Sequence, residues 1–491
     1  MQSPCHFARL LAFLGIWVLL YVSACSAEAI DWVQASYDKV IDLGGAVSNF
    51  ELSISASPAS LPSGDRAFYK VYLSGEEHEK LAKISATLSS SPKGKPKADL
   101  DVLFWGPSVD DEETFVYLVE VPSSALKDNE PIHLKVSGSM LHISIPLPLE
   151  IEQGKEQLLY WQGDTVPRSP YPIEKATVIL NTNDPILSYG PTLSASQSGK
   201  SVSFGPHQNV PPFNPTDSRS LSGFVHYAYL NPVATYAKYR RHVEISHWGD
   251  NMATEDHIWL RNDGPALKGH FSRAKHMINN FHNPAQERMS QIISVPLMLP
   301  VGSKDVYFVD AVGNVSTSML SAPSPATGAR RLDLRPRFPI LGGWNYTFTT
   351  GWNQRMSTHG LIRSVLTKPG RVRVAVPFLI APKSAAVDDA EIRIVLPEGA
   401  TDIDVTLPFA VDALSMDVYP TYLDTVGRPS VLIRRRRCIW KHGKMIYIEY
   451  SLSIWSQLRK PMAVSIAALL LFIMAAFVRR QSVSIQRVKT Q

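Results

Sequence analysis

Histidine and carboxylate residues are grouped at several points of the chain, but their spacing matches no metal-binding motif. The tripeptide Glu77–Glu79 begins like the zinc motif H-E-x-x-H, yet no second histidine follows it. Two further groups of histidines have spacings that fit no common ligand arrangement: His242, His247 and His257, and separately His276 and His282. We expect them to be ordinary core or surface residues, and we predict no metal and no cofactor.

Motifs for nucleotides and nucleophiles are incomplete as well. Ser198–Ser201 resembles the end of a phosphate-binding loop, but Ser194 stands where the first glycine of that loop is needed. Asp402 and Asp404 form a D-x-D pair, but they lie on an alternating, strand-like segment rather than in an α/β domain. With no G-x-S-x-G either, the residues predict no catalytic site.

Two positions could instead be modified. Asn314-Val-Ser316 and Asn345-Tyr-Thr347 are acceptor sequences for N-linked glycans, which require a translocated chain and an exposed asparagine. Asn314 follows a glycine in a turn-like setting and is the better candidate. Asn345 lies between Trp344 and Tyr346, where burial could block the modification.

The charge distribution argues against nucleic-acid binding. The 491 residues include 49 Lys and Arg and 44 Asp and Glu, a net charge of +5. The surplus lies at the ends, in Arg9, Arg479, Arg480, Arg487 and Lys489, so residues 28–478 carry equal numbers of both signs. A neutral body lacks the basic face that phosphate recognition needs, and we predict no nucleic-acid partner.

The first 27 residues have the layout of a secretory signal peptide. A weakly basic start precedes the apolar run Leu10–Val22, and small residues follow up to Ala27. Cleavage there would also remove Cys5 and Cys25. The mature chain would keep only Cys438 and could form no internal disulfide.

A second apolar segment predicts a membrane helix. Met462–Val478 has 17 uncharged residues, with Arg459 and Lys460 before it and Arg479 and Arg480 after it. Such a helix is about 26 Å long, close to the thickness of the endoplasmic reticulum (ER) bilayer. Together with the signal peptide, it predicts a single-pass type I protein with the transmembrane segment at 459–480 and a short cytosolic tail at 481–491.

The body between these segments has the period of β structure. Apolar and polar residues alternate in several short segments, among them 371–376, 391–396 and 444–450, and 36 Pro and 28 Gly separate such segments. We expect a mainly β fold of two antiparallel sandwich-like domains, residues 28–238 and 239–458. The most loop-like stretch is 188–222, and we see no internal sequence repeat.

Six blocks in the second half resemble the ribophorin I family, whose members are the first subunit of the eukaryotic oligosaccharyltransferase complex. The blocks follow the family's order and precede a single membrane helix; they are Val243–Gly249, Leu267–Arg273, Gly313–Thr317, Arg335–Trp344, Leu396–Ala400 and Tyr422–Pro429. The resemblance singles out these positions as structurally important: His247, Trp248, Gly249, Arg335, Pro336, Arg337, Phe338, Gly343, Trp344, Asp424, Gly427, Arg428 and Pro429. We expect the glycines among them to form turns that need unusual backbone angles.

The resemblance implies a role without chemistry of its own. The complex transfers a preassembled glycan from dolichyl diphosphate to Asn in Asn-X-Ser/Thr of nascent polypeptides, and its catalytic subunit is another, polytopic chain. A member of the family is expected in the ER membrane with its bulk in the lumen. Its implied partners are the catalytic and other subunits of the complex, nascent polypeptides and the protein translocation channel. Trp248 and Trp344 could contact subunits or peptides, or simply pack in the core.

Two other readings fit parts of the sequence. A type I cell-surface adhesion protein or receptor ectodomain would share the layout but should show disulfides and a longer membrane helix. A lumenal enzyme would need a convergent acid, base and nucleophile.

Overall fold

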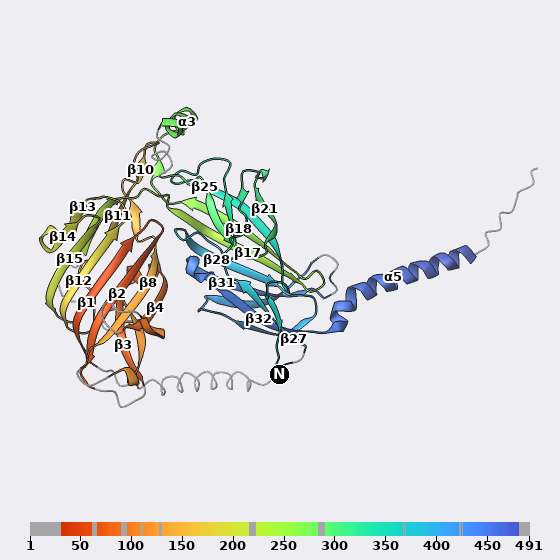
Figure 1. Cartoon of the computed structure of the whole chain (residues 1–491), viewed down its shortest axis with the longest axis horizontal. Coiled ribbons are helices and arrows are strands. Elements are labelled where there is room, and N and C mark those ends of the chain that lie inside the picture. Colours follow the sequence, from red (N-terminus) through yellow and green to blue (C-terminus); the bar gives the residue numbers. More distant parts are fainter. Residues whose placement is uncertain are drawn as a thin grey trace, which may run out of the picture.

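The computed structural model describes residues 31–480, except for 61–65, 90–95, 110, 127–129, 216–221, 283–289, 367, 369, 422, 423 and 425. Two β-sheet bodies lie side by side, and a long helix projects from the second (Figure 1). The predicted signal peptide and the tail 481–491 lie outside the described residues.

The first body consists of one large and two smaller sheets. The large sheet has the order β14-β15-β12-β1-β2-β8-β4-β5, and the smaller ones are β3-β7-β6 and β13-β16-β11-β9. Their bounds are β1 Trp32–Leu43, β2 Val47–Pro58, β3 Arg66–Ser74, β4 Leu81–Ser89, β5 Pro96–Leu100, β6 Val102–Pro107, β7 Thr114–Pro122, β8 Ile132–Leu141, β9 Ser144–Pro146, β11 Leu158–Asp164, β12 Ile173–Thr182, β13 Ile186–Gly190, β14 Ala195–Ser198, β15 Ser201–Val210 and β16 Ser222–Ala228. The stretch expected to be most loop-like, 188–222, therefore contains β14, β15 and part of β13.

The second body is also built from three main sheets. Its large sheet has the order β22-β21-β25-β18-β17-β28-β31-β30, with the smaller sheets β20-β24-β23 and β26-β27-β32-β29. Their bounds are β17 Ala234–Ser246, β18 Asn251–Asn262, β20 Val295–Leu299, β21 Lys304–Asp310, β22 Gly313–Asn314, β23 Met319–Leu320, β24 Arg330–Leu334, β25 Asn345–Arg355, β26 Ile362–Ser364, β27 Arg371–Pro377, β28 Ala386–Val395, β29 Ala400–Thr406, β30 Ala413–Tyr419, β31 Arg428–Cys438 and β32 Met445–Leu452.

The two bodies have the same topology. When the large sheets are compared strand by strand, β1, β2, β8, β12 and β15 take the places of β17, β18, β25, β28 and β31. In both, the first strand pairs antiparallel with the second and parallel with a strand far along the chain: β1 with β12, and β17 with β28. The smaller sheets correspond as well. The chain thus contains a structural repeat although we see no repeat in its sequence. Each large sheet is mixed, with parallel and antiparallel pairs, rather than purely antiparallel.

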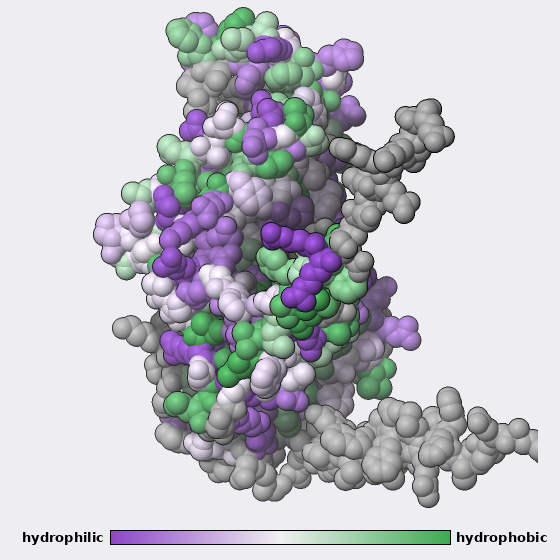
Figure 2. Space-filling view, turned by 90° about the vertical axis from the view of Figure 1, so that its right-hand side faces the viewer, coloured by the Kyte–Doolittle hydropathy of each residue, from purple (hydrophilic) through white to green (hydrophobic). Residues whose placement is uncertain are grey.

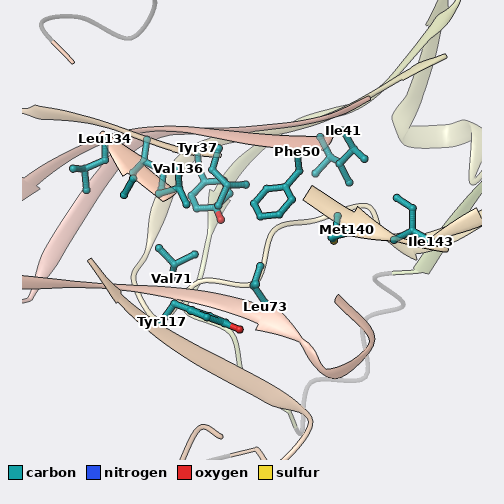
Figure 3. Packing of buried hydrophobic residues seen from close by; sticks show 14 of the residues in the cluster. Tyr37, Ile41, Phe50, Val71, Leu73, Tyr117, Leu134, Val136, Met140 and Ile143 are labelled. Carbon is teal, nitrogen blue, oxygen red and sulfur yellow. The ribbon is translucent and has the colours of Figure 1, made fainter. Parts of the chain in front are cut away.

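Alternating side chains produce the cores. In β18 every second residue is buried, which places one face of the strand inward and the other outward. In the first body, Tyr37, Phe50 and Val136 of the large sheet face Val71 and Tyr117 of a smaller sheet across a buried hydrophobic layer (Figure 3). A second cluster, from Tyr236 to Tyr450, forms the core of the other body.

The repeat divides the chain between Ala228, where β16 ends, and Ala234, where β17 begins. Residue 238, at which the sequence divided the domains, lies inside β17. We propose that the two bodies are the domains and that residues 229–233 connect them.

Several polar contacts hold the bodies together. The Arg437 Nη1 donates to the backbone oxygen of His78 (3.0 Å), and the Arg435 Nη2 donates to that of Ala82 (3.1 Å). The His142 Nε2 lies 2.8 Å from the Asp388 Oδ1. At the top of Figure 1, β10 (Glu150–Ile151) pairs in parallel with β19 (Ala266–Leu267).

Three α-helices complete the described part of the chain: α2 (Gly75–Lys80), α3 (Arg273–His282) and α5 (Ile454–Arg480). The short α2 is closed by a capping box between Ser74 and Glu77. The long α5 contains the predicted apolar core and begins eight residues before it, directly after the last strand.

Candidate functional site: two clusters of family positions

The structure sorts the six family blocks into two clusters at different places in the second body. Blocks 243–249 and 396–400 and the described residues of block 422–429 meet at the base of α5; we call their contact region with this helix the juxtamembrane cluster. Blocks 267–273, 313–317 and 335–344 meet around Asn314; we call this region the sequon cluster. Segments far apart in sequence therefore form two compact groups.

The helix α5 is long and apolar enough to cross a membrane. It has 27 residues and a mean hydropathy of 2.5 in its most apolar window, none of which is buried. Figure 2 looks along this helix toward the body, with its green hydrophobic side chains ending in purple hydrophilic ones. The chain is therefore membrane-anchored, and the juxtamembrane cluster lies where the anchor leaves the body.

Two acidic side chains of the body bind the basic residues at the start of this helix. Lys460 forms an ion pair with Asp424, and its Nζ lies 3.5 Å from the Glu398 Oε2. The Arg459 Nη1 is 3.9 Å from the Glu398 Oε1. Both carboxylates are nearly buried, with side chains 2% (Asp424) and 6% (Glu398) exposed. Buried carboxylates need such partners, so the cluster fixes the direction in which the helix leaves.

Neighbouring groups keep Asp424 ionised. Burial alone would raise the pKa of its carboxyl, but hydrogen bonds from Lys460 and Thr421 and the charge of Arg428 outweigh it, and lower the pKa to about 2. The Arg428 Nε lies 3.3 Å from Asp424, and its Nη1 is 3.5 Å from Glu244. Arg428 thus links the cluster to β17.

His247, Trp248 and Gly249 form a turn after β17 that touches the same helix. The Trp248 Nε1 donates to the backbone oxygen of Gln457 (3.1 Å), and the His247 Nε2 is 2.6 Å from the Tyr450 hydroxyl. Burial lowers the pKa of His247, which favours the neutral ring. Trp248 is 67% exposed and is therefore not a core residue.

The turn glycines differ in backbone conformation. Gly343 (φ 77°) and Gly427 (φ 81°) have positive φ angles that favour glycine. We expected the same of Gly249, but the positive φ of that turn is at Asp250 (46°). Gly249 instead donates its backbone N–H to the Ser246 hydroxyl (3.2 Å). Pro429, two residues after Gly427, lies in β31, and its carbonyl accepts the N–H of Leu396 (2.9 Å).

A cavity of about 670 Å³ opens beside these contacts. Its apolar lining comes from Ile245, Trp248, Pro397, Leu452, Pro461 and Val464. Its polar lining includes the charged Glu398, Arg428 and Lys460 together with His247, Gln457 and three serines. The volume falls within the range of about 300–1,000 Å³ typical of sites for small ligands.

The sequon cluster is organised by Arg337. Its Nε donates to the Asp310 Oδ2 (2.6 Å), and its Nη2 donates to the carbonyl of Asn314 (3.0 Å). The Tyr346 hydroxyl also bonds Asp310 (2.9 Å). These contacts lower the pKa of Asp310 to about 2, the bond from Arg337 being the largest cause. Arg337 thereby fixes the turn that presents Asn314.

Aromatic rings support the same turn. Phe338 packs edge-on against Trp344 (6.0 Å between centroids) and Tyr346 (5.6 Å), and Trp344 packs against Phe271 (5.7 Å). Trp344 is half-buried. The carbonyl of Arg335 accepts a hydrogen bond from the Thr317 hydroxyl (2.7 Å), and Pro336 connects it to Arg337.

Both predicted acceptor asparagines are exposed. Asn314 lies in the two-residue strand β22, and Asn345 lies at the start of β25. The neighbours of Asn345 point the other way along the strand, so Tyr346 is buried while Asn345 and Thr347 face outward. The burial that could have blocked Asn345 is therefore absent.

Sequence reasoning missed Glu398 and Lys460 as partners. Glu398 lay within a family block, and Lys460 was counted only as a basic flank of the membrane helix. The available signal was an acidic residue in a block together with basic residues just before an apolar run. The long stretch of chain between the two residues hid the pairing.

The described part of the chain contains no group of three His, Cys, Asp or Glu side chains that could hold a metal ion. His78, the candidate nearest to a zinc motif, stacks on Phe115 (3.9 Å between centroids), and its Nδ1 is 2.8 Å from the Tyr117 hydroxyl. Asp402 and Asp404 lie on β29, as expected for a strand.

Comparison with known proteins gives consistent matches. Residues 32–479 match the family described as Ribophorin I. Dolichyl-diphosphooligosaccharide–protein glycosyltransferase subunit 1B of Oryza sativa subsp. japonica is 31% identical, over 72% of this chain and 71% of that protein. Subunit 1 of the same name from Caenorhabditis elegans is 26% identical, over 88% and 70%, and subunit 1B from Arabidopsis thaliana is 30% identical, over 71% and 72%.

Solved structures resemble the chain only weakly. Yeast leukotriene A4 hydrolase aligns with a TM-score of 0.26 at 8% identity, covering 41% of this chain and 30% of that protein. A likeness of this size carries no argument about activity.

Proposed function

Because the chain belongs to the ribophorin I family, we propose that it is an accessory subunit of the oligosaccharyltransferase complex. Its body lies in the ER lumen on a single membrane helix, and it serves protein N-glycosylation without catalysing the transfer. The observation that carries this proposal is the match to ribophorin I over residues 32–479 together with relatives named as subunit 1 of the glycosyltransferase.

The structure supports an assembly role in two ways. The juxtamembrane cluster ties the body to α5 through paired charges, which gives a partner in the membrane a body of fixed orientation. The surface also has apolar side chains that a protein partner could cover, among them Met277, Ile278 and Phe281 on α3. We propose that the partners are the catalytic and other subunits, nascent polypeptides and the translocation channel.

The alternative of a cell-surface adhesion protein has less support. An adhesion ectodomain should contain disulfides, whereas Cys438 is free and buried in the structure. The relatives also carry the name of a glycosyltransferase subunit.

Affinity isolation of the tagged full chain from membranes in mild detergent tests the proposal. We expect oligosaccharyltransferase activity and a polytopic partner to be recovered with it, and the chain stripped of partners to be inactive. Recovery of the chain alone from the cell surface would favour the adhesion alternative. Activity that persists in the stripped chain would refute the non-catalytic role.

A further inference from the structure

We infer that the cavity beside α5 binds the headgroup of a zwitterionic membrane phospholipid, one that carries a phosphate and a quaternary ammonium group. The inference needs only the membrane anchoring of the chain. It therefore stands or fails separately from the proposed place in a glycosyltransferase complex.

The position of the cavity selects a membrane lipid as its occupant. One wall is α5 itself, through Pro461, Val464 and Ser465, at the start of the uninterrupted apolar run. The opposite wall contains Ile245 and Leu452 of the body. The cavity is thus continuous with the surface that α5 presents to the bilayer, and a lipid can enter from the membrane without passing through water.

The charges select the headgroup. Arg428, Lys460 and Glu398 line the cavity, and their ion-pair partners Arg459, Asp424 and Glu244 lie behind them, so the surroundings are close to neutral. A headgroup with a net charge would meet as much repulsion as attraction. A headgroup that carries both signs can place its phosphate by the cations and its ammonium by the carboxylates.

Two cations can still reach a phosphate. The Lys460 side chain remains 38% exposed, and its ammonium has three donor hydrogens, one of which is used in the hydrogen bond to Asp424, while Glu398 lies 3.5 Å away. The Arg428 side chain is 22% exposed and has five donor hydrogens. Their carboxylate partners hold both groups at the polar end of the cavity.

Trp248 supplies a surface for the ammonium. Its ring is 67% exposed, lines the cavity, and is held in place by the bond from its Nε1 to the Gln457 carbonyl. A quaternary ammonium packs favourably on the face of an indole ring.

A photo-crosslinking experiment on the full chain tests the inference. Purified chain is reconstituted in nanodiscs that contain a trace of diazirine-labelled phosphatidylcholine or phosphatidylglycerol, and crosslinked peptides are mapped by mass spectrometry. We expect phosphatidylcholine to label peptides 245–248 and 452–465. Phosphatidylglycerol at equal content should label them about threefold to tenfold less, in line with the strength of ammonium–indole contacts.

Matched variants separate the cavity from the general lipid surface. Val464→Trp fills the cavity and should abolish this labelling, whereas Leu470→Trp, in the same helix but outside the cavity lining, should leave it unchanged. Trp248→Ala should reduce the preference for phosphatidylcholine. If Val464→Trp does not fold, Ser465→Trp tests the same wall.

Three results would overturn the inference. One is equal labelling of the cavity peptides in wild-type chain and in a folded cavity-filling variant, because the label would then report only surrounding lipid. Another is equal labelling by the two lipids. The third is loss of labelling when the chain is isolated with its partners, because a partner segment would then fill the cavity.

Discussion

Individual residues show how far burial controls reactivity in this protein. Cys438 is fully buried at the end of β31, and burial raises the pKa of its thiol to about 12. Because the thiolate is the reactive form, the thiol stays protonated and inert at neutral pH. Burial in this way protects the Cys438 thiol from mispairing.

This protection can be measured directly. We expect a maleimide reagent at pH 7 to leave Cys438 of the purified full chain unlabelled under native conditions and to label it after unfolding in urea. Raising the pH to 9 should not increase the labelling of Cys438 in the native chain, because the pKa of its thiol in the folded state is higher still. Labelling of the native chain as fast as that of an exposed control, Glu174→Cys, would contradict the buried position.

The exposure of the two acceptor asparagines predicts that both are glycosylated. Because the Asn345 side chain faces outward on β25, we expect it to carry a glycan, and we expect the same of the exposed Asn314. Asn345→Gln and Asn314→Gln should each remove one mobility step that glycosidase treatment also removes. The double variant should show no shift on such treatment, and Asn183→Gln, outside any acceptor sequence, is the control. A chain without either glycan would argue against a lumenal body.

Among the elements, β17 and β18 are joined by a fully buried ion pair. The Arg241 Nε and Nη2 each lie 2.7 Å from an Asp256 oxygen, and the Nη1 donates to the Pro377 carbonyl (2.7 Å) of β27. The large sheet and a smaller sheet are thereby linked through one guanidinium. Its neighbours Trp352 and Tyr239 complete a tightly packed, desolvated site.

Removing one charge of this pair should be costly. Asp256→Asn leaves Arg241 buried without its counter-ion, and we expect a loss of about 3–5 kcal/mol in the free energy of unfolding. Glu51→Gln, which breaks the exposed pair with Lys135, should cost less than about 1 kcal/mol. Urea denaturation of the full chain in detergent, followed by tryptophan fluorescence, measures both. Equal effects of the two changes would show that burial does not govern the pair.

The attachment of α5 to the body depends on the ion pair between Lys460 and Asp424. Asp424→Asn should weaken the contact with Lys460 and let the helix move relative to the body, which spin labels at Thr401→Cys and Arg480→Cys would report as a broader distance distribution. Asp417→Asn, on the exposed strand β30, is the matched control.

The pH dependence of this attachment has a definite sign. The pKa of Asp424 in the folded chain, about 2, is below its ordinary value of 3.8. The stabilisation that the ionised carboxylate gives to the attachment of α5 is therefore complete above about pH 4 and is lost as the pH falls toward 2. A distance distribution that is unchanged in Asp424→Asn would show that Asp424 does not orient the helix.

At the scale of the whole molecule, contacts at several points hold the two repeated bodies in a defined arrangement. Arg435 and Arg437 donate to backbone oxygens of the other body, and His142 lies near the carboxylates of Asp388 and Asp263. Arg437 has a positive φ angle (54°), which directs its side chain away from the regular path of β31. The basic run Arg434–Arg437 therefore serves the junction between bodies and the neighbouring strands.

Weakening this junction should loosen the bodies without unfolding them. We expect the double variant Arg437→Ala, Asp388→Asn to broaden the distance distribution between spin labels at Glu174→Cys and Thr401→Cys, with the midpoint of urea denaturation little changed. Arg436→Ala is the control, because its bonds to Asp412 and Cys438 use backbone atoms that the substitution keeps. An unchanged distribution would show that the apolar contacts suffice to fix the arrangement.

The sequence by itself determined the local properties of this protein. The alternation of residues in segments such as 371–376 and 391–396, now β27 and the end of β28, indicated strands, because a period of two is visible in any segment of a half-buried sheet. The uncharged run between basic residues indicated the membrane helix, because such a run is also visible within one short segment of the chain. The family blocks were legible as well, because each is a short continuous segment.

Only the tertiary structure decided which distant segments meet. The repeat of the two bodies consists of strand order, which two different sequences can share, so it need not appear as a sequence repeat. The parallel pairing of β17 with β28 joins residues about 150 positions apart, beyond any local signal. The pairing of Lys460 with Asp424 and Glu398 likewise depends on how β29, β31 and α5 are arranged. The sequence shows which residues are charged, but only the folded chain shows which of them are neighbours.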